Sequence, residues 1–387
     1  MKRILHIIPS LESGGAEKQL ANLVTNTSEQ KFSHHICTFR NSEFFAPEIQ
    51  KAGYVVQELD IAGKHPWLAG AIRLLPVIRK YKPDLICSWL FDAGIVSRLT
   101  WLRHFRIPII NTLHLTQYDR ETIDGGNWSP TKVEVLRLVD KLTAKITQPY
   151  FAACSEEVKR SYCRHLRIDE SRITTIYNGI DPTNLVCDVY ESERIRDELG
   201  FSRDTFVYLS VGRLAPQKNY ALLLRVFSQL LTTIPQARLV IVGVGPIEAE
   251  LTKLANSLQI TSKVHFLGER KDIGACLEMA DVFVMPSLFE GMPLALLEAM
   301  FKELPCIVSR IEVLKEVIED NKNGLLIDPN TPNELLEAMI KLYEDPELKA
   351  RLGQRAKNDA ERRFHISKIA SQWESYFTNV LDAKNDS

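Results

Sequence analysis

The sequence lacks a long hydrophobic run, a secretion signal and paired cysteines. No apolar run among its 387 residues approaches the roughly 20 that a membrane-spanning helix needs. The apolar start at Ile4 stops at Pro9 and Glu12, too early for a signal peptide, so we expect a first strand there. The seven cysteines are dispersed and form no CxxC pair, which argues against a zinc site or a disulfide framework. Reduced thiols indicate a cytoplasmic protein.

Several ligand-binding signatures are also missing. The sequence has neither a GxGxxG fingerprint nor a Walker loop, which argues against a dinucleotide or ATP site. It has no DxD-type cluster at a strand end, so we expect no bound metal and no cofactor. The net charge is −1 and no basic, aromatic-rich module is present, which argues against nucleic-acid binding. The charge is uneven, however: residues 1–180 carry 24 Lys and Arg against 18 Asp and Glu, and the remainder carries 24 against 31.

Short apolar runs alternate with amphipathic stretches along most of the chain. With 45% apolar and 25% charged residues, the chain is long enough for two globular domains. This alternation predicts an α/β fold with two doubly wound, Rossmann-like parallel sheets. Strands are expected in the first half at residues 4–8, 35–39, 54–59, 85–89, 109–113, 150–154 and 173–176. The pattern restarts at Val207, with a helix predicted at Tyr220–Thr233.

We therefore predict a first Rossmann-like domain at 1–182, a linker at 183–200, a second Rossmann-like domain at 201–364 and a final helix at 365–387. In this helix Ile369, Trp373, Phe377 and Val380 form one apolar stripe. The stripe predicts that the helix packs back on the first domain. A free, frayed tail is the alternative.

The stretch 281–298 contains a predicted strand, a loop and a helix start. Val282–Met285 suits a buried strand and Leu294–Phe301 a helix, whose free N–H groups favour an anion. Glu290 lies in the loop and Glu298 in the second turn of the helix, so both carboxylates can face one cleft. An ionised carboxylate suits the hydroxyls of a sugar. Two solvated surface residues are the simpler interpretation of the spacing alone.

Two other loops follow predicted strands. Arg213 and Lys218 lie in one loop after residues 207–211 and together suit a diphosphate, although solvated cations are the alternative. Gly14 and Gly15 follow the first strand, where paired glycines let the backbone approach a ligand. The loops that contain Arg213 and Glu290 follow strands of one sheet, so we expect them at the same edge.

The order of four motifs, GGAE, NGID, GRLAPQKN and FEGMPLALLE, resembles the family 4 retaining glycosyltransferases. The resemblance covers nearly the whole chain. It implies the GT-B fold, in which two Rossmann-like domains face each other across a cleft. The resemblance makes residues 1–182 the acceptor-binding domain and residues 201–364 the nucleotide-sugar-binding domain. It also implies that Arg213 and Lys218 hold the donor diphosphate and that Glu298 holds the ribose hydroxyls.

At the sugar, the resemblance implies that Glu290 binds the transferred ring. The donor would also contact the backbone of Gly291, Met292, Pro293 and Leu294, and Gly15 would leave room for it. His114 resembles the family histidine near the reaction centre, although a histidine after a strand is more often structural. One departure stands out: many relatives carry a histidine where this chain reads Ser88-Trp89-Leu90.

These implications predict a retaining hexosyl- or N-acetylhexosaminyltransferase. It would use a nucleotide-diphosphate sugar, most simply UDP-linked, and a glycan or polyprenyl-diphosphate-linked acceptor in polysaccharide or lipid-linked oligosaccharide biosynthesis. Stabilisation of the leaving diphosphate would drive transfer. A GT-B sugar-nucleotide epimerase, or a catalytically silent nucleotide-sugar-binding subunit, is the alternative.

A peripheral contact with the inner face of the cell membrane is a further expectation. Basic residues gather at 79–82, 98–106 and 132–145. In the second stretch the predicted lipid-binding surface consists of Arg98, Trp101, Leu102, Arg103, Phe105 and Arg106. A packed helix with solvated cations would give the same pattern.

Overall fold

The computed structural model describes residues 1–41, 44–61 and 67–385. The chain divides into two compact units. Unit 1 comprises Met1–Tyr118, Ser129–Gly179 and Ile366–Ser387. Unit 2 comprises Asp119–Trp128 and Ile180–His365. Each unit is built on one parallel sheet.

Unit 1 contains a seven-stranded sheet in the order β3-β2-β1-β4-β5-β6-β7, and every neighbouring pair is parallel. The strands are β1 Lys2–Ile8, β2 Phe32–Thr38, β3 Val55–Glu58, β4 Leu85–Trp89, β5 Ile109–Leu113, β6 Tyr150–Ala153 and β7 Ile173–Thr175. All seven predicted strands of the first half are present. The strand order reverses between β1 and β4, as in doubly wound sheets.

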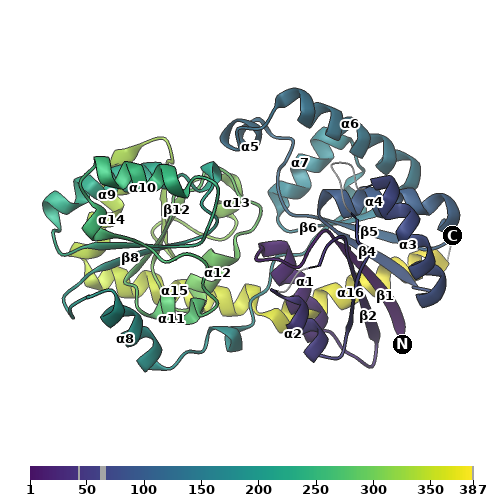
Figure 1. Cartoon of the computed structure of the whole chain (residues 1–387), viewed down its shortest axis with the longest axis horizontal. Coiled ribbons are helices and arrows are strands. Elements are labelled where there is room, and N and C mark those ends of the chain that lie inside the picture. Colours follow the sequence, from purple (N-terminus) through teal and green to yellow (C-terminus); the bar gives the residue numbers. More distant parts are fainter. Residues whose placement is uncertain (42–43, 62–66, 386–387) are drawn as a thin grey trace. The chain divides into compact units, whose positions relative to one another are not determined.

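Helices cover both faces of this sheet (Figure 1). One face carries α1 Gly15–Asn26, α2 Ala46–Lys51 and α16 Ile366–Asn385; the other carries α3 Trp67–Tyr81, α4 Leu90–His104, α6 Pro130–Thr147 and α7 Glu156–Leu166. The strands are therefore buried on both sides, which explains their nearly continuous apolar sequences.

The last helix, α16, is part of the core of unit 1. Ile369, Trp373, Phe377 and Val380 are each at most 6% exposed and lie in the same cluster as residues of β1 and β4. The hydroxyl of Tyr376 donates a hydrogen bond of 2.8 Å to the carbonyl of Phe151 on β6. Helix α16, which follows unit 2 in the sequence, thus covers one face of the sheet formed by the first 180 residues.

The lipid-binding surface predicted at 98–106 is wrong at Arg98. Its guanidinium is 3% exposed and pairs with Asp140 of α6 at 2.5 Å, while its Nε donates to Asn111 at 2.6 Å. Trp101 is half-buried against the core. Arg103, Phe105 and Arg106 are exposed, and the side chain of Leu102 lies outside the described residues. The amphipathic pattern of α4 reflects packing within unit 1, because Arg98 is buried and paired with Asp140.

Unit 2 contains a six-stranded parallel sheet in the order β10-β9-β8-β11-β12-β13. The strands are β8 Val207–Val211, β9 Arg238–Val242, β10 Val264–Phe266, β11 Val282–Met285, β12 Cys306–Ser309 and β13 Leu325–Ile327. The predicted strand Val282–Met285 is confirmed, and β13 is an addition. The two sheets confirm the expected α/β fold class.

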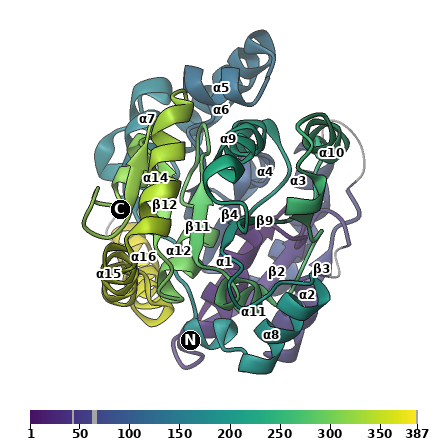
Figure 2. The ribbon, with the colours of Figure 1, turned by 90° about the vertical axis from the view of Figure 1, so that its left-hand side faces the viewer.

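The helices of unit 2 also lie on both faces of its sheet (Figures 1 and 2). One face carries α9 Tyr220–Thr233, α10 Glu248–Ser257 and α14 Pro332–Glu344; the other carries α8 Val189–Glu198, α11 Ile273–Glu278, α12 Leu294–Phe301 and α15 Pro346–Phe364. Two short helices complete the described α-helices, α5 Arg120–Gly125 and α13 Glu312–Lys315. The predicted helices at 220–233 and 294–301 are confirmed. Residues 183–200, expected as a linker, include α8 and lie within unit 2.

No helix in the described part of the chain is both long enough and apolar enough to span a bilayer.

Candidate active site

The loop after β8 is pressed against the chain that follows β9. An added Cβ at Gly243 would overlap the carbonyl of Gly212, and one at Gly245 would overlap the carbonyl of Leu214. Gly243 also has a φ of +137°, which side chains rarely adopt. These close backbone contacts fix the loop that carries Arg213 and Lys218.

Lys218 and Glu290 meet in a nearly buried ion pair. Lys218 closes a 3₁₀ turn at Pro216–Lys218, and its Nζ lies 2.6 Å from Oε1 of Glu290. The two side chains are 13% and 6% exposed. The amide of Gln217 donates to Oε2 of Glu290 at 3.2 Å and to the carbonyl of Phe289 at 2.9 Å. The two loops predicted to share an edge are therefore joined by direct contacts.

This pairing leaves both groups able to act on a ligand. An ammonium group has three donors, and Glu290 accepts one of those of Lys218, so the other two are available to an anion. The carboxylate has two oxygens with several lone pairs and can accept hydrogen bonds from hydroxyl groups. Because both charges are largely removed from water, loss of either one leaves an uncompensated charge.

Helix α12 begins at Leu294, four residues after Glu290. Pro293 caps the helix with extended backbone, and Gly291, Met292, Pro293 and Leu294 are all buried. The first N–H groups of a helix have no partner within it and favour negative charge. Glu298 is 4% exposed and lies in the second turn, as its spacing predicted. This end of the sheet therefore combines a helix N-terminus, a cation and two carboxylates.

Arg213 differs from its neighbours in the loop. Its side chain is exposed and forms no ion pair with a carboxylate of the described residues. The next residue, Leu214, is fully buried, so the packed side of the loop is occupied by leucine and Arg213 faces solvent. The structure brings together Lys218 and Glu290 by contact but not Arg213.

A segment from between β5 and α6 belongs to unit 2, and no motif near it in the sequence indicates this. Asp119–Trp128 includes α5 and packs near the 3₁₀ turn at Pro216–Lys218. A Cβ added to Gly125 would lie 3.1 Å from the ring of Phe289, and Trp128 meets the same ring edge-on at 6.3 Å between centroids. The segment supports the residue next to Glu290.

Gly15 and Glu17 open α1 in unit 1. Gly15 is the first helical residue and is exposed, and Gly14 caps the helix in extended conformation. The carboxylate of Glu17 folds back so closely that an added Cβ on Gly14 would overlap it. Burial raises the pKa of Glu17 above its usual value. A half-buried carboxylate thus lies over the turn after β1.

His114 follows β5 and is held by two neighbours. Its Nε2 lies 2.8 Å from Oγ1 of Thr112, and its ring stacks on Trp89 with 5.5 Å between centroids. Burial lowers the pKa of His114 to about 4, so the ring is neutral at pH 7. It can therefore donate or accept a hydrogen bond there, but it carries no charge.

A buried chain of hydrogen bonds lies beneath Trp89. Trp89 donates to Nδ1 of His6 at 3.1 Å, His6 Nε2 lies 2.9 Å from Nδ1 of His34, and His34 Nε2 lies 2.8 Å from Oγ1 of Thr27. An indole N–H can only donate, so His6 must carry its proton on Nε2 and donate to His34. His34 must then donate to Thr27. Both histidines are neutral, and every ring nitrogen is used.

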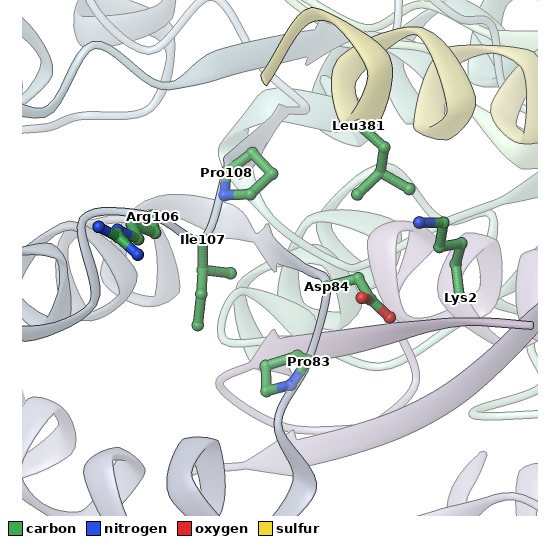
Figure 3. Close-up of a pocket in the computed structure, with 7 residues that line it drawn as sticks. All are labelled: Lys2, Pro83, Asp84, Arg106, Ile107, Pro108 and Leu381. Atoms are coloured by element: carbon green, nitrogen blue, oxygen red, sulfur yellow. The ribbon is translucent and has the colours of Figure 1, made fainter. Parts of the chain in front are cut away.

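A pocket in unit 1 is lined by none of the predicted site residues (Figure 3). Its lining includes Lys2, Asp84 and Pro108, which lie at or just before the amino ends of β1, β4 and β5. The predicted site residues follow the carboxyl ends of their strands. Among the described residues, no three His, Cys, Asp or Glu side chains are grouped in a way that suits a metal ion.

Comparison with known proteins gives two family matches along the chain. Residues 13–184 match the model described as Glycosyltransferase Family 4. Residues 191–359 match the model described as Glycosyl transferases group 1.

Individual relatives match over most of their length. The chain is 30% identical over 318 residues to the UDP-Gal:alpha-D-GlcNAc-diphosphoundecaprenol alpha-1,3-galactosyltransferase of Escherichia coli, covering 80% of this chain and 79% of that protein. It is 28% identical over 326 residues to the alpha-monoglucosyldiacylglycerol synthase of Acholeplasma laidlawii, covering 81% and 79%. Among solved structures, Anabaena HepE in complex with UDP-glucose has a TM-score of 0.84 at 21% identity, covering 98% of this chain and all of that one.

Proposed function

The chain belongs to the family 4 glycosyltransferases and has their GT-B fold of two Rossmann-like domains, and on this premise we propose that it transfers a sugar from a UDP-sugar with retention of anomeric configuration. The acceptor in this proposal is a hydroxyl group of a glycan or a lipid-linked saccharide. The transferred sugar is a hexose or an N-acetylhexosamine.

The contact between Lys218 and Glu290 is the observation that supports this function most directly. A nearly buried cation in contact with the loop that leads into α12 suits the diphosphate of a nucleotide sugar. The paired carboxylate suits the hydroxyls of the adjoining sugar ring. Glu298, further along α12, is assigned to the ribose hydroxyls. The backbone from Gly291 to Leu294 is assigned to the part of the donor that lies between the sugar ring and the ribose.

In this mechanism the leaving group receives most of the stabilisation. As the bond between sugar and diphosphate breaks, negative charge grows on the diphosphate, where Lys218 and the helix dipole act on it. Arg213 is on the solvent side of the same loop and is assigned to the outer phosphate. Glu290 is engaged by Lys218 and Gln217, so its role is to orient the sugar and not to attack it. The acceptor hydroxyl attacks from the face that the diphosphate leaves, and its proton passes to an oxygen of the departing diphosphate.

Two residues of unit 1 complete the proposal. His114 is neutral at pH 7 and is assigned a hydrogen bond to the transferred sugar. Gly15, exposed at the start of α1, is assigned the role of leaving space for the phosphates and the sugar.

Titration calorimetry with UDP, together with turnover of a donor sugar, tests the assignments. Lys218→Ala should weaken UDP binding and lower kcat by about 10²- to 10³-fold, as loss of one charge-stabilising donor does. Glu290→Ala should lose transfer and keep most UDP binding, whereas Glu298→Ala should weaken UDP binding as well. Lys253→Ala, at an exposed lysine of α10, is the matched control. Normal turnover in a correctly folded Lys218→Ala variant would refute the assignment.

The donor and the reaction type can be separated by product analysis. A panel of nucleotide sugars screened by thermal shift identifies the donor, because a ligand of the folded state raises the apparent stability. Incubation with that donor alone should give no epimerised sugar nucleotide. Conversion without acceptor would indicate an epimerase, and binding without any conversion would indicate a silent subunit.

The proposed acceptor is linked to a polyprenyl diphosphate and is used at the cytoplasmic face of the cell membrane. Support comes from the names of two relatives, since the E. coli protein acts on a diphosphoundecaprenol-linked sugar and the A. laidlawii protein makes a glycolipid. Transfer to a synthetic diphospholipid acceptor, compared with the same sugar lacking the lipid, tests this part.

A further inference from the structure

Helix α6 leaves one apolar face uncovered. Its exposed apolar residues lie three or four positions apart, so they form a single stripe along the helix: Val135 55%, Leu138 45%, Leu142 60% and Ile146 62% exposed. At 1.5 Å per residue the stripe is about 16 Å long. Isolated exposed apolar residues are ordinary, but a contiguous row marks a binding surface.

The opposite face of α6 is fixed to the rest of unit 1. Val133, Asp140 and Ala144 are buried there, and the helix packs on α4 and α7. The carboxylate of Asp140 accepts from Arg98 at 2.5 Å and from the hydroxyl of Tyr118 at 2.6 Å. These buried contacts prevent rotation of the helix about its axis. The apolar stripe is therefore held facing outward.

Basic residues flank the stripe. Lys132 and Lys145 are exposed and Lys141 is half-buried, and none of the three forms an ion pair within the described part of the chain. The one exposed carboxylate of the helix, on Glu134, is already paired with Arg137. The outward face of α6 thus offers aliphatic side chains and uncompensated positive charge.

From these observations we propose that α6 rests on an anionic phospholipid membrane, with the four aliphatic residues at the acyl boundary and the lysines at the headgroups. Helices that lie in a membrane interface combine an apolar face with flanking lysines. Protein interfaces are instead enriched in aromatic residues and depleted of lysine, so a second copy of the chain is a poorer match. The inference rests on the proposed function where it places a lipid-linked acceptor at the membrane, yet vesicle binding is measured without any transfer.

Co-sedimentation with vesicles tests the proposal. The full chain should bind phosphatidylcholine vesicles that contain phosphatidylglycerol, and should bind pure phosphatidylcholine weakly. Leu142→Asp combined with Ile146→Asp should lower the partition coefficient by roughly tenfold or more, because two carboxylates would replace apolar side chains at the acyl boundary. Lys141→Ala and Lys145→Ala should each reduce binding to anionic vesicles about fivefold, and added salt should have a similar effect.

Controls separate this proposal from its rivals. Val186→Asp changes an apolar residue of unit 2 that is 79% exposed and should leave vesicle binding unchanged. All the α6 substitutions are at surface positions, and unchanged circular dichroism and unfolding midpoints verify the fold. Failure of the wild-type chain to bind anionic vesicles, or equal binding by the α6 variants, would overturn the proposal. So would a dimer in sedimentation velocity that the Leu142 and Ile146 substitutions dissociate. Vesicle binding that persists without sugar transfer would refute the proposed enzyme function alone.

Discussion

Lowering the pH from about 7.5 to about 5 should destabilise unit 1, because its buried histidine chain has no site for another proton. Trp89, His6, His34 and Thr27 use every ring nitrogen in one direction of donation. A proton added to either histidine would place two donors against each other. Burial lowers the pKa of His34 to about 4 and that of His6 well below its usual value.

The direction and the size of this destabilisation follow from proton linkage. The pKa of His34 is about 4 in the folded chain and about 6.5 when unfolded, so between these values mainly the unfolded chain binds the proton. The contribution of His34 to the free energy of unfolding is fully present above the pKa that it has in the unfolded chain. This contribution is lost as the pH falls toward the pKa that His34 has in the folded chain. At pH 5 the loss from His34 alone is about 2 kcal/mol. His6 and His114, whose pKa values are also lowered, act in the same direction.

Tryptophan fluorescence during urea unfolding measures this effect in the right part of the molecule. Trp67, Trp89, Trp101 and Trp373 belong to unit 1, and Trp128 is the remaining one of the five. The unfolding midpoint should therefore report mainly on unit 1. The midpoint should lie at a lower urea concentration at the lower pH, and the difference should correspond to a loss of about 2 kcal/mol or more in the free energy of unfolding.

Substitution of the neighbouring histidine provides a control. His34→Gln removes the buried titrating group and should flatten the pH dependence of the midpoint. His35→Gln, on the other face of β2, should leave most of it, because His35 is only half-buried and contacts Gln57. Equal midpoints at both pH values in the wild-type chain would refute the reasoning. The reasoning would also be refuted if the unfolding midpoint of His34→Gln fell between the two pH values as much as that of the wild-type chain.

Three further outcomes are expected. Asp140→Ala should destabilise unit 1 by about 3 to 5 kcal/mol, because it leaves the Arg98 guanidinium buried without its partner, and Asp140→Leu combined with Arg98→Met should recover much of the loss in urea unfolding. Trp373→Ala should cost about 3 to 5 kcal/mol in the same assay, since this ring is buried against Trp89; a loss below 1 kcal/mol would show that α16 adds little. Gly243→Ala should weaken UDP binding by about tenfold or more in calorimetry, because its Cβ would displace the loop that carries Lys218; unchanged affinity would separate that loop from the nucleotide.

Much of the fold could be predicted because its elements have strong local signals. Residues 85–89, 109–113 and 282–285 are apolar runs bounded by turn residues, and each is a strand with the predicted bounds. The proximity of the loops that carry Lys218 and Glu290 follows from a general property of parallel sheets, that loops after neighbouring strands share an edge. The sequence does not predict the ion pair itself. The strand β13 was missed because its three residues, Leu325–Ile327, are too short for a periodic pattern.

Other features depend on contacts between distant residues. The sequence around Arg98 indicates a surface cation, because its partner, Asp140, lies 42 residues away. Nothing near Gly125 in the sequence indicates that it packs on Phe289. His6 and His34 occur in apolar strands as isolated polar residues, and that is the one signal by which their buried pair could have been found. The role of His114 stays a prediction.

The position of α16 has a consequence for synthesis of the chain on the ribosome. Domains generally fold in order from the N-terminus as they emerge. Here the sheet made from the first 180 residues keeps an uncovered apolar face until Trp373 and Phe377 have left the exit tunnel. Residues 180–365 of unit 2 form one continuous stretch and can close around their own core earlier. The half of the protein that is translated first is thus the half that is finished last, and until then its β1–β4 surface is open to chaperones.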